Sequence, residues 1–192
     1  MPDLGRLKFA PMALPWGAPL TVDDLRRIPD DGHRYELVDG VLLVTPAPGT
    51  AHQTCVAMLV VAFVAAAPAT QLVLPAPYDW VVDPHTSFQP DVLVAHRVDV
   101  GEERLERAPL LVVEIHSPST RLADLTLKRA AYEAAGVPAY WLIDPAQPSL
   151  TVLRLEEGRY VEEAKVVGDE RYDASWPFPV SIVPNALLGG RT

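Results

Sequence analysis

The sequence predicts an α/β (α+β) fold in which a mixed central β-sheet is flanked by helices. Strand, helix and strand follow one another between Leu110 and Ile143, which is the βαβ pattern of two parallel strands. Two pairs of apolar runs, at residues 35–45 and 150–167, are each joined by a short polar turn, as in antiparallel hairpins. Parallel and antiparallel pairs in one sheet make that sheet mixed.

The N-terminal part contains a helix start and a hairpin turn. Thr21 is followed three residues later by Asp24, the pattern of a helix N-cap with its reciprocal acid, and Pro29 ends the short helix. Asp39-Gly40 tolerates the positive φ angles of a two-residue hairpin turn. Residues 1–20 are rich in proline and glycine without any period, so we expect a flexible arm there and a single domain over residues 21–192.

Further helices and strands follow from apolar runs and their breakers. Residues 51–66 predict a buried helix that Pro68 terminates and in which Cys55 is a small apolar side chain. A second helix, at residues 123–135, stops at Gly136. The tail from Asp173 is rich in proline and has no defined pattern. The remaining runs predict strands at residues 71–74, 78–82, 91–95, 110–116, 139–143, 150–155 and 160–167.

The charge and the N-terminus limit the partners and the compartment. A formal net charge of −9 opposes a broad basic surface for nucleic acid, although a local strip containing Arg121, Lys128 and Arg129 is compatible with an acidic whole. No basic flank precedes an apolar run at the N-terminus, so no secretory signal is expected. The longest apolar stretch, residues 55–68, is shorter than the roughly 20 residues of a spanning helix. We expect a cytoplasmic protein with no membrane contact.

Three carboxylates lie in or beside apolar strands. Asp91 begins the strand that continues as Val92-Leu-Val94, Glu114 is embedded among apolar residues, and Glu36 lies between Tyr35 and Leu37. A buried isolated charge is costly unless it is paired, protonated or bound to a metal. Acids that converge are usually held by a hard divalent cation, for which Mg²⁺ is the natural candidate. The alternative is that each acid faces solvent or pairs with an arginine.

The helix after the Glu114 strand carries polar residues along one side. Arg121, Leu125, Lys128 and Tyr132 recur at helical spacing. A lysine beside metal-bound water can stabilise charge on a phosphate, although a solvated helix lysine is the alternative.

Two histidines are further candidates for the site. His52, near the start of the long helix, is a candidate substrate contact or a surface cap. His116, two residues after Glu114, points to the same side of the strand and is a candidate metal or substrate contact or a structural histidine.

Together these segments resemble the PD-(D/E)XK nuclease superfamily, and in particular a group of small bacterial restriction endonuclease-like proteins. The resemblance covers residues 21–155. The segments that carry it are Arg34-Tyr-Glu-Leu-Val-Asp-Gly40, Ala51-His-Gln53, Gln89-Pro-Asp-Val92, Val112-Val-Glu-Ile-His-Ser-Pro-Ser-Thr120, Lys128 with Tyr132, and Gly136-Val-Pro-Ala-Tyr-Trp-Leu-Ile-Asp-Pro145.

The resemblance implies a reaction and a set of ligands. Asp91 and Glu114 would be the paired metal ligands, with the carbonyl of Ile115 as a third, and Glu36 would be an accessory acid. His116 stands where the superfamily usually has a lysine, and the resemblance transfers that role to Lys128. The implied reaction is hydrolysis of phosphodiester bonds in DNA by water activated by Mg²⁺, with Mn²⁺ as the alternative ion. The expected substrate contacts are His52, Arg121 and Tyr132.

Three functions remain open at this point. The first is an active endonuclease, for which a homodimer is expected because cutting both strands usually takes two sites. The second is a nuclease-fold protein without turnover that binds nucleic acid or regulates. The third is a structural module whose acids pair with arginines. For the first, Asp91→Asn and Glu114→Gln are expected to abolish cleavage and to raise stability by relieving repulsion between acids.

Overall fold

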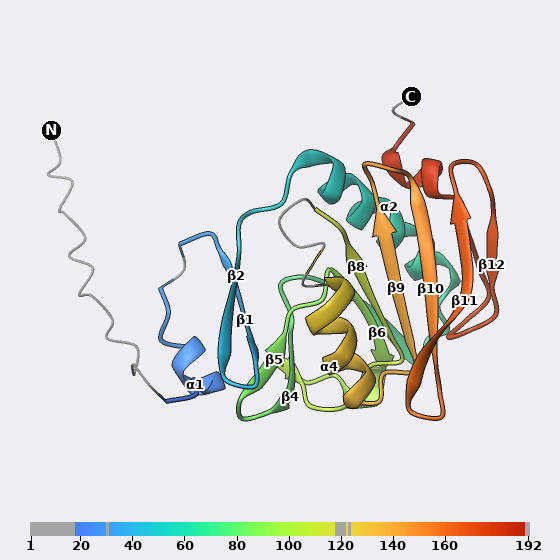
Figure 1. The fold of residues 1–192 in the computed structure, drawn as a ribbon. Helices are drawn as coiled ribbons and strands as arrows, with labels where there is room; N and C mark the ends of the chain where they lie inside the picture. The colour runs from blue at the N-terminus through green and yellow to red at the C-terminus, as the bar shows by residue number, and fades with distance from the viewer. Residues whose placement is uncertain (1–17, 30, 118–121, 123, 191–192) are drawn as a thin grey trace, which may run out of the picture.

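The computed structural model of the protein describes residues 18–29, 31–117, 122 and 124–190, which form two main sheets (Figure 1). The first sheet has the strand order β2 (Val41–Thr45), β1 (Arg34–Val38), β5 (Thr86–Phe88), β4 (Asp79–Asp83) and β7 (Arg104–Leu105). The second has the order β11 (Arg159–Val167), β10 (Ser149–Glu156), β9 (Ala139–Asp144), β8 (Leu111–Ile115), β6 (Val92–His96) and β3 (Gln71–Pro75). A small third sheet pairs β12 (Tyr172–Ala174) with β13 (Val180–Ile182).

The helical elements of the described residues are few and mostly short. They are α1 (Val22–Leu25), α2 (Thr50–Ala66), a π-helical turn (Asp124–Lys128) that leads directly into α4 (Arg129–Ala134), and 3₁₀ turns at Arg97–Asp99 and Pro184–Leu188. No helix within these ranges is long and apolar enough to cross a bilayer.

The six-stranded sheet contains the predicted βαβ unit. β8 and β9 are parallel, with Leu111 opposite Ala139 and Ile115 opposite Ile143. The other neighbours in this sheet are antiparallel, and the first sheet is also mixed because β4 and β7 are parallel. The predicted mixed α+β fold is therefore confirmed.

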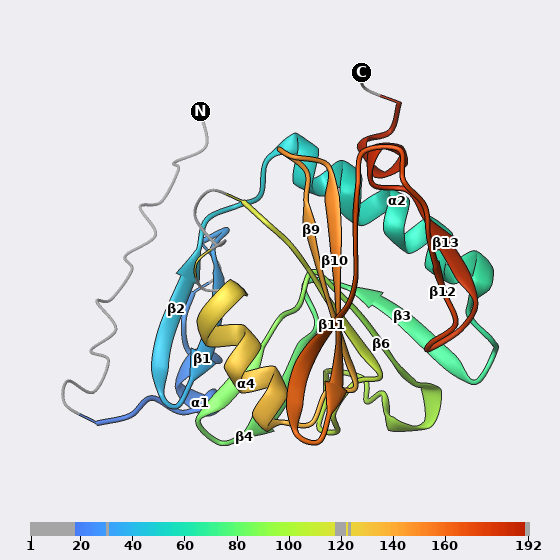
Figure 2. The ribbon, with the colours of Figure 1, turned by 45° about the vertical axis from the view of Figure 1, so that its right-hand side comes forward.

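Helices cover both faces of the six-stranded sheet, with α2 behind and α4 in front in Figure 2. The alternation of side chains along β8 separates two cores. Val113 packs on the α2 face with Phe63, whereas Val112 lies in the opposite core with Tyr132 of α4. Glu114, the next residue, points to the α4 face, where it contacts Tyr132.

The N-terminal predictions agree with the structure where it is described. Thr21 and Asp24 form a reciprocal capping box at the start of α1. Asp39 and Gly40 turn β1 into β2 with φ angles of 50° and 76°. A Cβ atom on Gly40 would clash with Cβ of Pro19, so this position also requires a residue without a side chain. Residues 1–17 of the predicted arm lie outside the described residues.

The structure departs from the expected fold in three places. The 35–45 hairpin does not join the βαβ unit but forms the separate five-stranded sheet, because β1 pairs with β5. β5 and β7 were not expected, since strands of three and two residues show no period. The tail beyond Asp173 is ordered into β13 and a 3₁₀ turn, and Phe178 packs edge-on against Phe63 with ring centroids 5.6 Å apart.

Candidate active site

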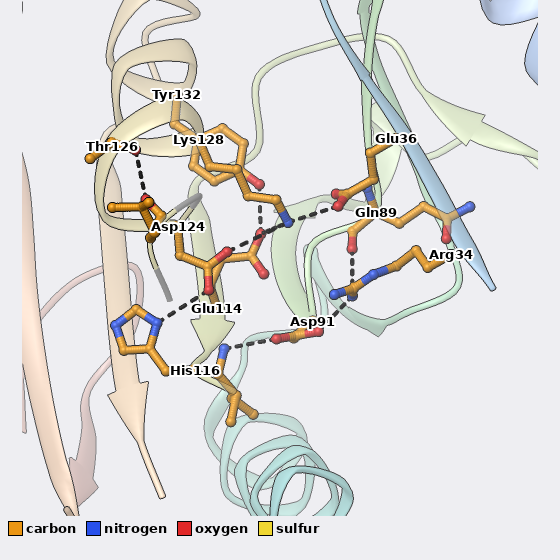
Figure 3. A network of polar contacts seen from close by, with 12 residues as sticks. Arg34, Glu36, Gln89, Asp91, Glu114, His116, Asp124, Thr126, Lys128 and Tyr132 are labelled. Atoms are coloured by element: carbon orange, nitrogen blue, oxygen red, sulfur yellow. Dashed lines mark hydrogen bonds and ion pairs between the residues drawn. The ribbon is translucent and has the colours of Figure 1, made fainter. Parts of the chain in front are cut away.

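Asp91, the residue directly before β6, and Glu114 of the antiparallel neighbour β8 lie at the same end of the six-stranded sheet. The last pair in the register of β6 and β8 is Val92 with Val113, so the next positions along the two strands are Asp91 and Glu114. Their exposed fractions are only 2% and 1%. The two acids singled out in the sequence are thus buried side by side (Figure 3).

Asp91 is held by donors from three directions. Its Oδ1 lies 2.6 Å from Nη1 of Arg34, and its Oδ2 accepts a hydrogen bond from the Ile115 amide at 2.8 Å. Nε2 of His52, in the first turn of α2, lies 3.0 Å from Oδ2. Burial opposes ionisation, but the His52 hydrogen bond and the charges of Arg34 and Lys128 outweigh it and hold the pKa of Asp91 well below its usual range. Asp91 is therefore ionised at neutral pH.

One carboxylate oxygen of Glu114 makes two close contacts. Its Oε1 lies 3.0 Å from Nζ of Lys128 and accepts a hydrogen bond from the Tyr132 hydroxyl at 2.6 Å. Burial raises the pKa of Glu114 to about 8 against the opposing pull of Lys128, and the nearby Asp91 and Asp124 charges add to the rise. At pH 7 Glu114 thus retains a proton most of the time.

Lys128 is a buried cation, so the alternative of a solvated helix lysine is wrong. Its Nζ lies 2.9 Å from Oε2 of Glu36 as well as 3.0 Å from Glu114, and its side chain is 3% exposed. Burial disfavours the charge, but Glu114 and Glu36 outweigh it and keep the pKa of Lys128 above its usual value. The π-helical turn leads into α4 so that Lys128 and Tyr132, four residues apart, both face β8.

Glu36 connects the two sheets at the site. It is 1% exposed on β1, which excludes the solvent-facing alternative. Its Oε1 accepts a hydrogen bond from the Gln89 amide at 2.9 Å. Its Oε2 faces Lys128 as an ion pair, but it accepts no aligned hydrogen bond from any described residue. Glu36 therefore has one buried carboxylate oxygen without a hydrogen bond from the described residues.

His116 and Asp124 form a second buried pair behind Glu114. Nδ1 of His116 lies 3.2 Å from Oδ2 of Asp124, and the exposed fractions are 7% and 1%. Oδ1 of Asp124 lies 3.9 Å from Nζ of Lys128 and accepts no hydrogen bond among the described residues. Sequence reasoning missed Asp124, although its place four residues before Lys128 puts both on one helix face.

The other predicted site residues differ in their surroundings. Tyr132 is buried among the rings of Trp80, Phe88 and Tyr140, and in this structure it supports Glu114, while its predicted role as a substrate contact stays a prediction. Ile115 contacts Asp91 through its amide, and its carbonyl as a metal ligand also stays a prediction. Arg121 lies outside the described residues.

A cavity of about 710 Å³ opens beside Asp91. Arg34, His52, Gln89 and Asp91 line its polar side, and α1 together with residues 46–48 supplies apolar walls. Among the described residues, Glu36, Glu114 and Lys128 do not line this cavity. Of the four buried acids, Asp91 is thus the one that lines this cavity, whose volume is in the range of small-ligand pockets.

Arg34 was also missed as a site residue. It begins β1 and looks in the sequence like an ordinary strand-end arginine. Its Nη1 contacts Asp91, 57 positions away in the sequence, and donates to the Gln89 carbonyl at 3.1 Å. Burial disfavours its charge, but Asp91, Glu114 and Glu36 outweigh that effect and raise its pKa. The signal in the sequence is its place two residues before Glu36.

The charges of the site suit a divalent cation. With histidines counted as neutral and Glu114 counted in its ionised form, as it would be when bound to a metal ion, four buried carboxylates face two cations, which leaves two negative charges; these six residues are Glu36, Asp91, Glu114, Asp124, Arg34 and Lys128. Carboxylate oxygens are the ligands that Mg²⁺ takes. Within the described residues no three His, Cys, Asp or Glu side chains are arranged to hold a metal ion, and the acids are instead paired with Arg34 and Lys128. The carboxylates therefore suit a divalent cation in their chemistry and in their excess negative charge. A bound ion would take the place of the Arg34 or the Lys128 side chain beside them.

The fold and the buried acids define a restriction endonuclease-like protein. The chain belongs to the Uma2 family, described as "Putative restriction endonuclease", which it matches over residues 22–183. Its fold is similar to the crystal structure of "a putative nuclease belonging to DUF820" from Anabaena variabilis ATCC 29413, with a TM-score of 0.68 and 20% sequence identity over 89% of this chain and 98% of that chain. A comparison with curated proteins found no match.

Proposed function

We propose that this protein is a metal-dependent endonuclease that hydrolyses phosphodiester bonds in DNA. The observation that carries the proposal is the placement of Asp91, directly before β6, next to Glu114 of the neighbouring β8, both buried, in a cluster with two more negative charges than positive ones when Glu114 is ionised. Membership of a family described as "Putative restriction endonuclease" supports the same reaction. Stability alone does not explain why so many acidic residues are buried here, since apolar residues fill a core at lower cost.

Each residue has a proposed role. Asp91 and Glu114, with the Ile115 carbonyl, would hold Mg²⁺ or Mn²⁺, and Glu36 would be the accessory acid. A bound ion would supply a water molecule of lowered pKa and neutralise charge on the phosphate. Lys128, kept charged by Glu36 and Glu114, would stabilise negative charge that develops during hydrolysis.

The substrate is expected to bind locally. A net charge of −9 makes a broad electrostatic grip on DNA unfavourable, so the contacts should concentrate near the cavity that Arg34 and His52 line. His52 would contact the substrate there, Arg121 is a second proposed substrate contact, and a homodimer would bring two sites to the two strands of a duplex.

Cleavage assays with matched variants test the proposal. Plasmid and oligonucleotide DNA are incubated with the parent protein, Asp91→Asn, Glu114→Gln and the exposed control Lys165→Met, each with Mg²⁺, Mn²⁺ or EDTA. The expected result is metal-dependent cleavage by the parent and the control, and its loss in both acid variants. Cleavage that persists in EDTA, or in folded Asp91→Asn, would overturn the proposed mechanism.

A second function is favoured by the ion pairs of the cluster. Arg34 on Asp91 is the kind of pair that a module without turnover would use, and His116 stands in place of the usual strand lysine. A protein of this kind binds an oligonucleotide but cleaves none with any metal. A purely structural module would bind neither metal nor DNA, which calorimetry with Mg²⁺ and Mn²⁺ detects directly.

A further inference from the structure

We infer that Arg34 and the catalytic metal ion compete for Asp91, and that Arg34, once displaced, becomes the residue that receives a substrate phosphate in the cavity. This inference rests on the proposed function and assigns a role to a residue outside the expected ligand set. Arg34 would act as a stand-in cation for Asp91 in the metal-free protein and as a phosphate contact in the metal-bound protein.

The first support is the way the two oxygens of Asp91 are used. Oδ2 faces two donors, the Ile115 amide at 2.8 Å and Nε2 of His52 at 3.0 Å, and both come from elements that frame the site. Oδ1 has the guanidinium of Arg34 at 2.6 Å. The oxygen that remains for a metal ion is therefore the one that Arg34 holds, and an ion bound there would repel the guanidinium and weaken or displace its contact with Oδ1.

The second support is that Arg34 is the cation with room to leave. The Lys128 side chain is 3% exposed and is fixed between Glu36 and Glu114. The Arg34 side chain is 17% exposed and lines the cavity of about 710 Å³. Figure 3 shows that Arg34 reaches Asp91, whereas Lys128 reaches Glu36 and Glu114. A cation that enters through the cavity meets Arg34 before it meets the buried pair.

The third support is where a displaced Arg34 would remain. Its Nη1 also donates to the Gln89 carbonyl at 3.1 Å, a contact that does not depend on Asp91. This bond holds the guanidinium at the cavity wall, where its other N–H groups can face an incoming ligand. The planar fork of donors on an arginine matches the oxygens of a phosphate. The same side chain can thus neutralise the acid in one state and bind substrate in the other.

Metal affinity measured without substrate tests the competition. Isothermal titration with Mn²⁺ alone compares the parent with Arg34→Gln, which keeps a hydrogen-bond donor but loses the charge, and with Arg34→Lys, which keeps the charge. Arg26→Gln is the matched control, because Arg26 lines the same cavity but pairs with Asp23, at 3.5 Å. We expect Arg34→Gln to bind Mn²⁺ about tenfold more tightly, which corresponds to ~1.4 kcal/mol. Arg34→Lys and Arg26→Gln should stay near the parent.

The cleavage kinetics should change in the opposite direction. In Arg34→Gln at saturating Mn²⁺, the KM for DNA is expected to rise while kcat changes less, because a phosphate contact is lost and the metal site is kept. Unchanged or weaker Mn²⁺ binding by Arg34→Gln would overturn the competition, and an unchanged KM would overturn the phosphate contact.

A measurement on the unaltered protein covers the case in which Arg34→Gln does not fold. The side-chain Nε–H signal of Arg34, assigned by its loss in Arg34→Lys, is followed by NMR during titration with Mg²⁺. We expect it to move in step with metal binding. A signal that stays fixed while Mg²⁺ binds would refute the inference and leave the proposed function standing, whereas a parent protein that binds neither Mg²⁺ nor Mn²⁺ would refute both.

Discussion

Lys128 and Glu114 form an ion pair of 3.0 Å whose side chains are 3% and 1% exposed to solvent. Pairs so deeply buried are seldom the most stable filling of a core, because removing two charges from water costs as much as their attraction returns. Here the pair is also joined to Glu36 and Tyr132. Its persistence is understandable if the charges serve chemistry.

Replacing Lys128 by methionine should strongly destabilise the metal-free protein. The change leaves the buried Glu36 carboxylate without its cation, which typically costs about 3–5 kcal/mol, while Glu114, whose pKa is already raised to about 8, can take up a proton. Urea denaturation at pH 7 measures the loss. Lys165→Met, at an exposed position, is the control and should change stability by less than about 0.5 kcal/mol. A Lys128→Met protein as stable as the parent would show that the pair is not needed to balance the acids.

Neutralising the two paired acids should have opposite effects on stability. Glu114→Gln should stabilise the metal-free protein at pH 8 by roughly 2 kcal/mol, because burial raises the pKa of Glu114 to about 8 and its charge is therefore unfavourable. Asp91→Asn should destabilise it by about 3 kcal/mol, because the low pKa of Asp91 shows a favourable charge and its loss strands Arg34. The expectation that both changes stabilise is thus revised for Asp91.

The pH dependence of stability gives an internal check on these signs. For Glu114 the folded protein retains a proton between the ordinary pKa of 4.5 and about 8, whereas the unfolded chain has lost it. The contribution of Glu114 to stability therefore falls as pH rises through this window and levels off above it. Glu114→Gln should abolish that slope in urea denaturation series, and an unchanged slope would assign it to another group.

Metal binding should release a proton and strengthen as the pH rises towards 8. A ligand carboxylate must be deprotonated, and Glu114 is the acid of the cluster whose pKa lies near 8. Calorimetric titration with Mg²⁺ in buffers of different ionisation enthalpy counts the protons released at pH 7. We expect a value between zero and one that declines above pH 8. Proton uptake on binding would contradict the assignment of Glu114 as a ligand.

Removing the Tyr132 hydroxyl should affect activity more than an equivalent change elsewhere. Tyr132→Phe loses a buried hydrogen bond of 2.6 Å to Glu114, which should cost about 1–2 kcal/mol of stability and lower kcat. Tyr160→Phe is the matched control, because it loses a buried bond of 2.9 Å to the Val137 carbonyl, away from the acids. Equal losses of kcat in both variants would reduce Tyr132 to a structural residue.

Much of the site could be predicted because charges in apolar strands are conspicuous. Asp91 and Glu114 interrupt runs of residues that are otherwise apolar and buried. In the structure Lys128 contacts Glu114, and Glu36 contacts Lys128. Arg34 could not be singled out, because an arginine at the start of a strand looks like a surface residue until a contact 57 positions away is known. The role of each residue in catalysis stays a prediction.

The fold was predictable where local patterns are strong. The Asp39-Gly40 turn and the parallel pairing of β8 with β9 follow from turn chemistry and from the strand–helix–strand order. The division into two sheets depends on β5, whose three residues carry no period and whose partners are chosen by tertiary packing. The C-terminal strands β12 and β13 were missed for the same reason.

The π-helical turn at Asp124–Lys128 makes the site sensitive to the number of residues in that segment. Successive residues of an α-helix are rotated by about 100° around the helix axis. Deleting one residue inside the turn would therefore rotate Asp124 around this axis relative to Lys128 and Tyr132. Asp124 would then leave His116, even though no residue of that pair had been changed. Related chains that differ in length here should therefore have lost or rearranged the polar cluster, while substitutions that preserve the length should leave its geometry intact.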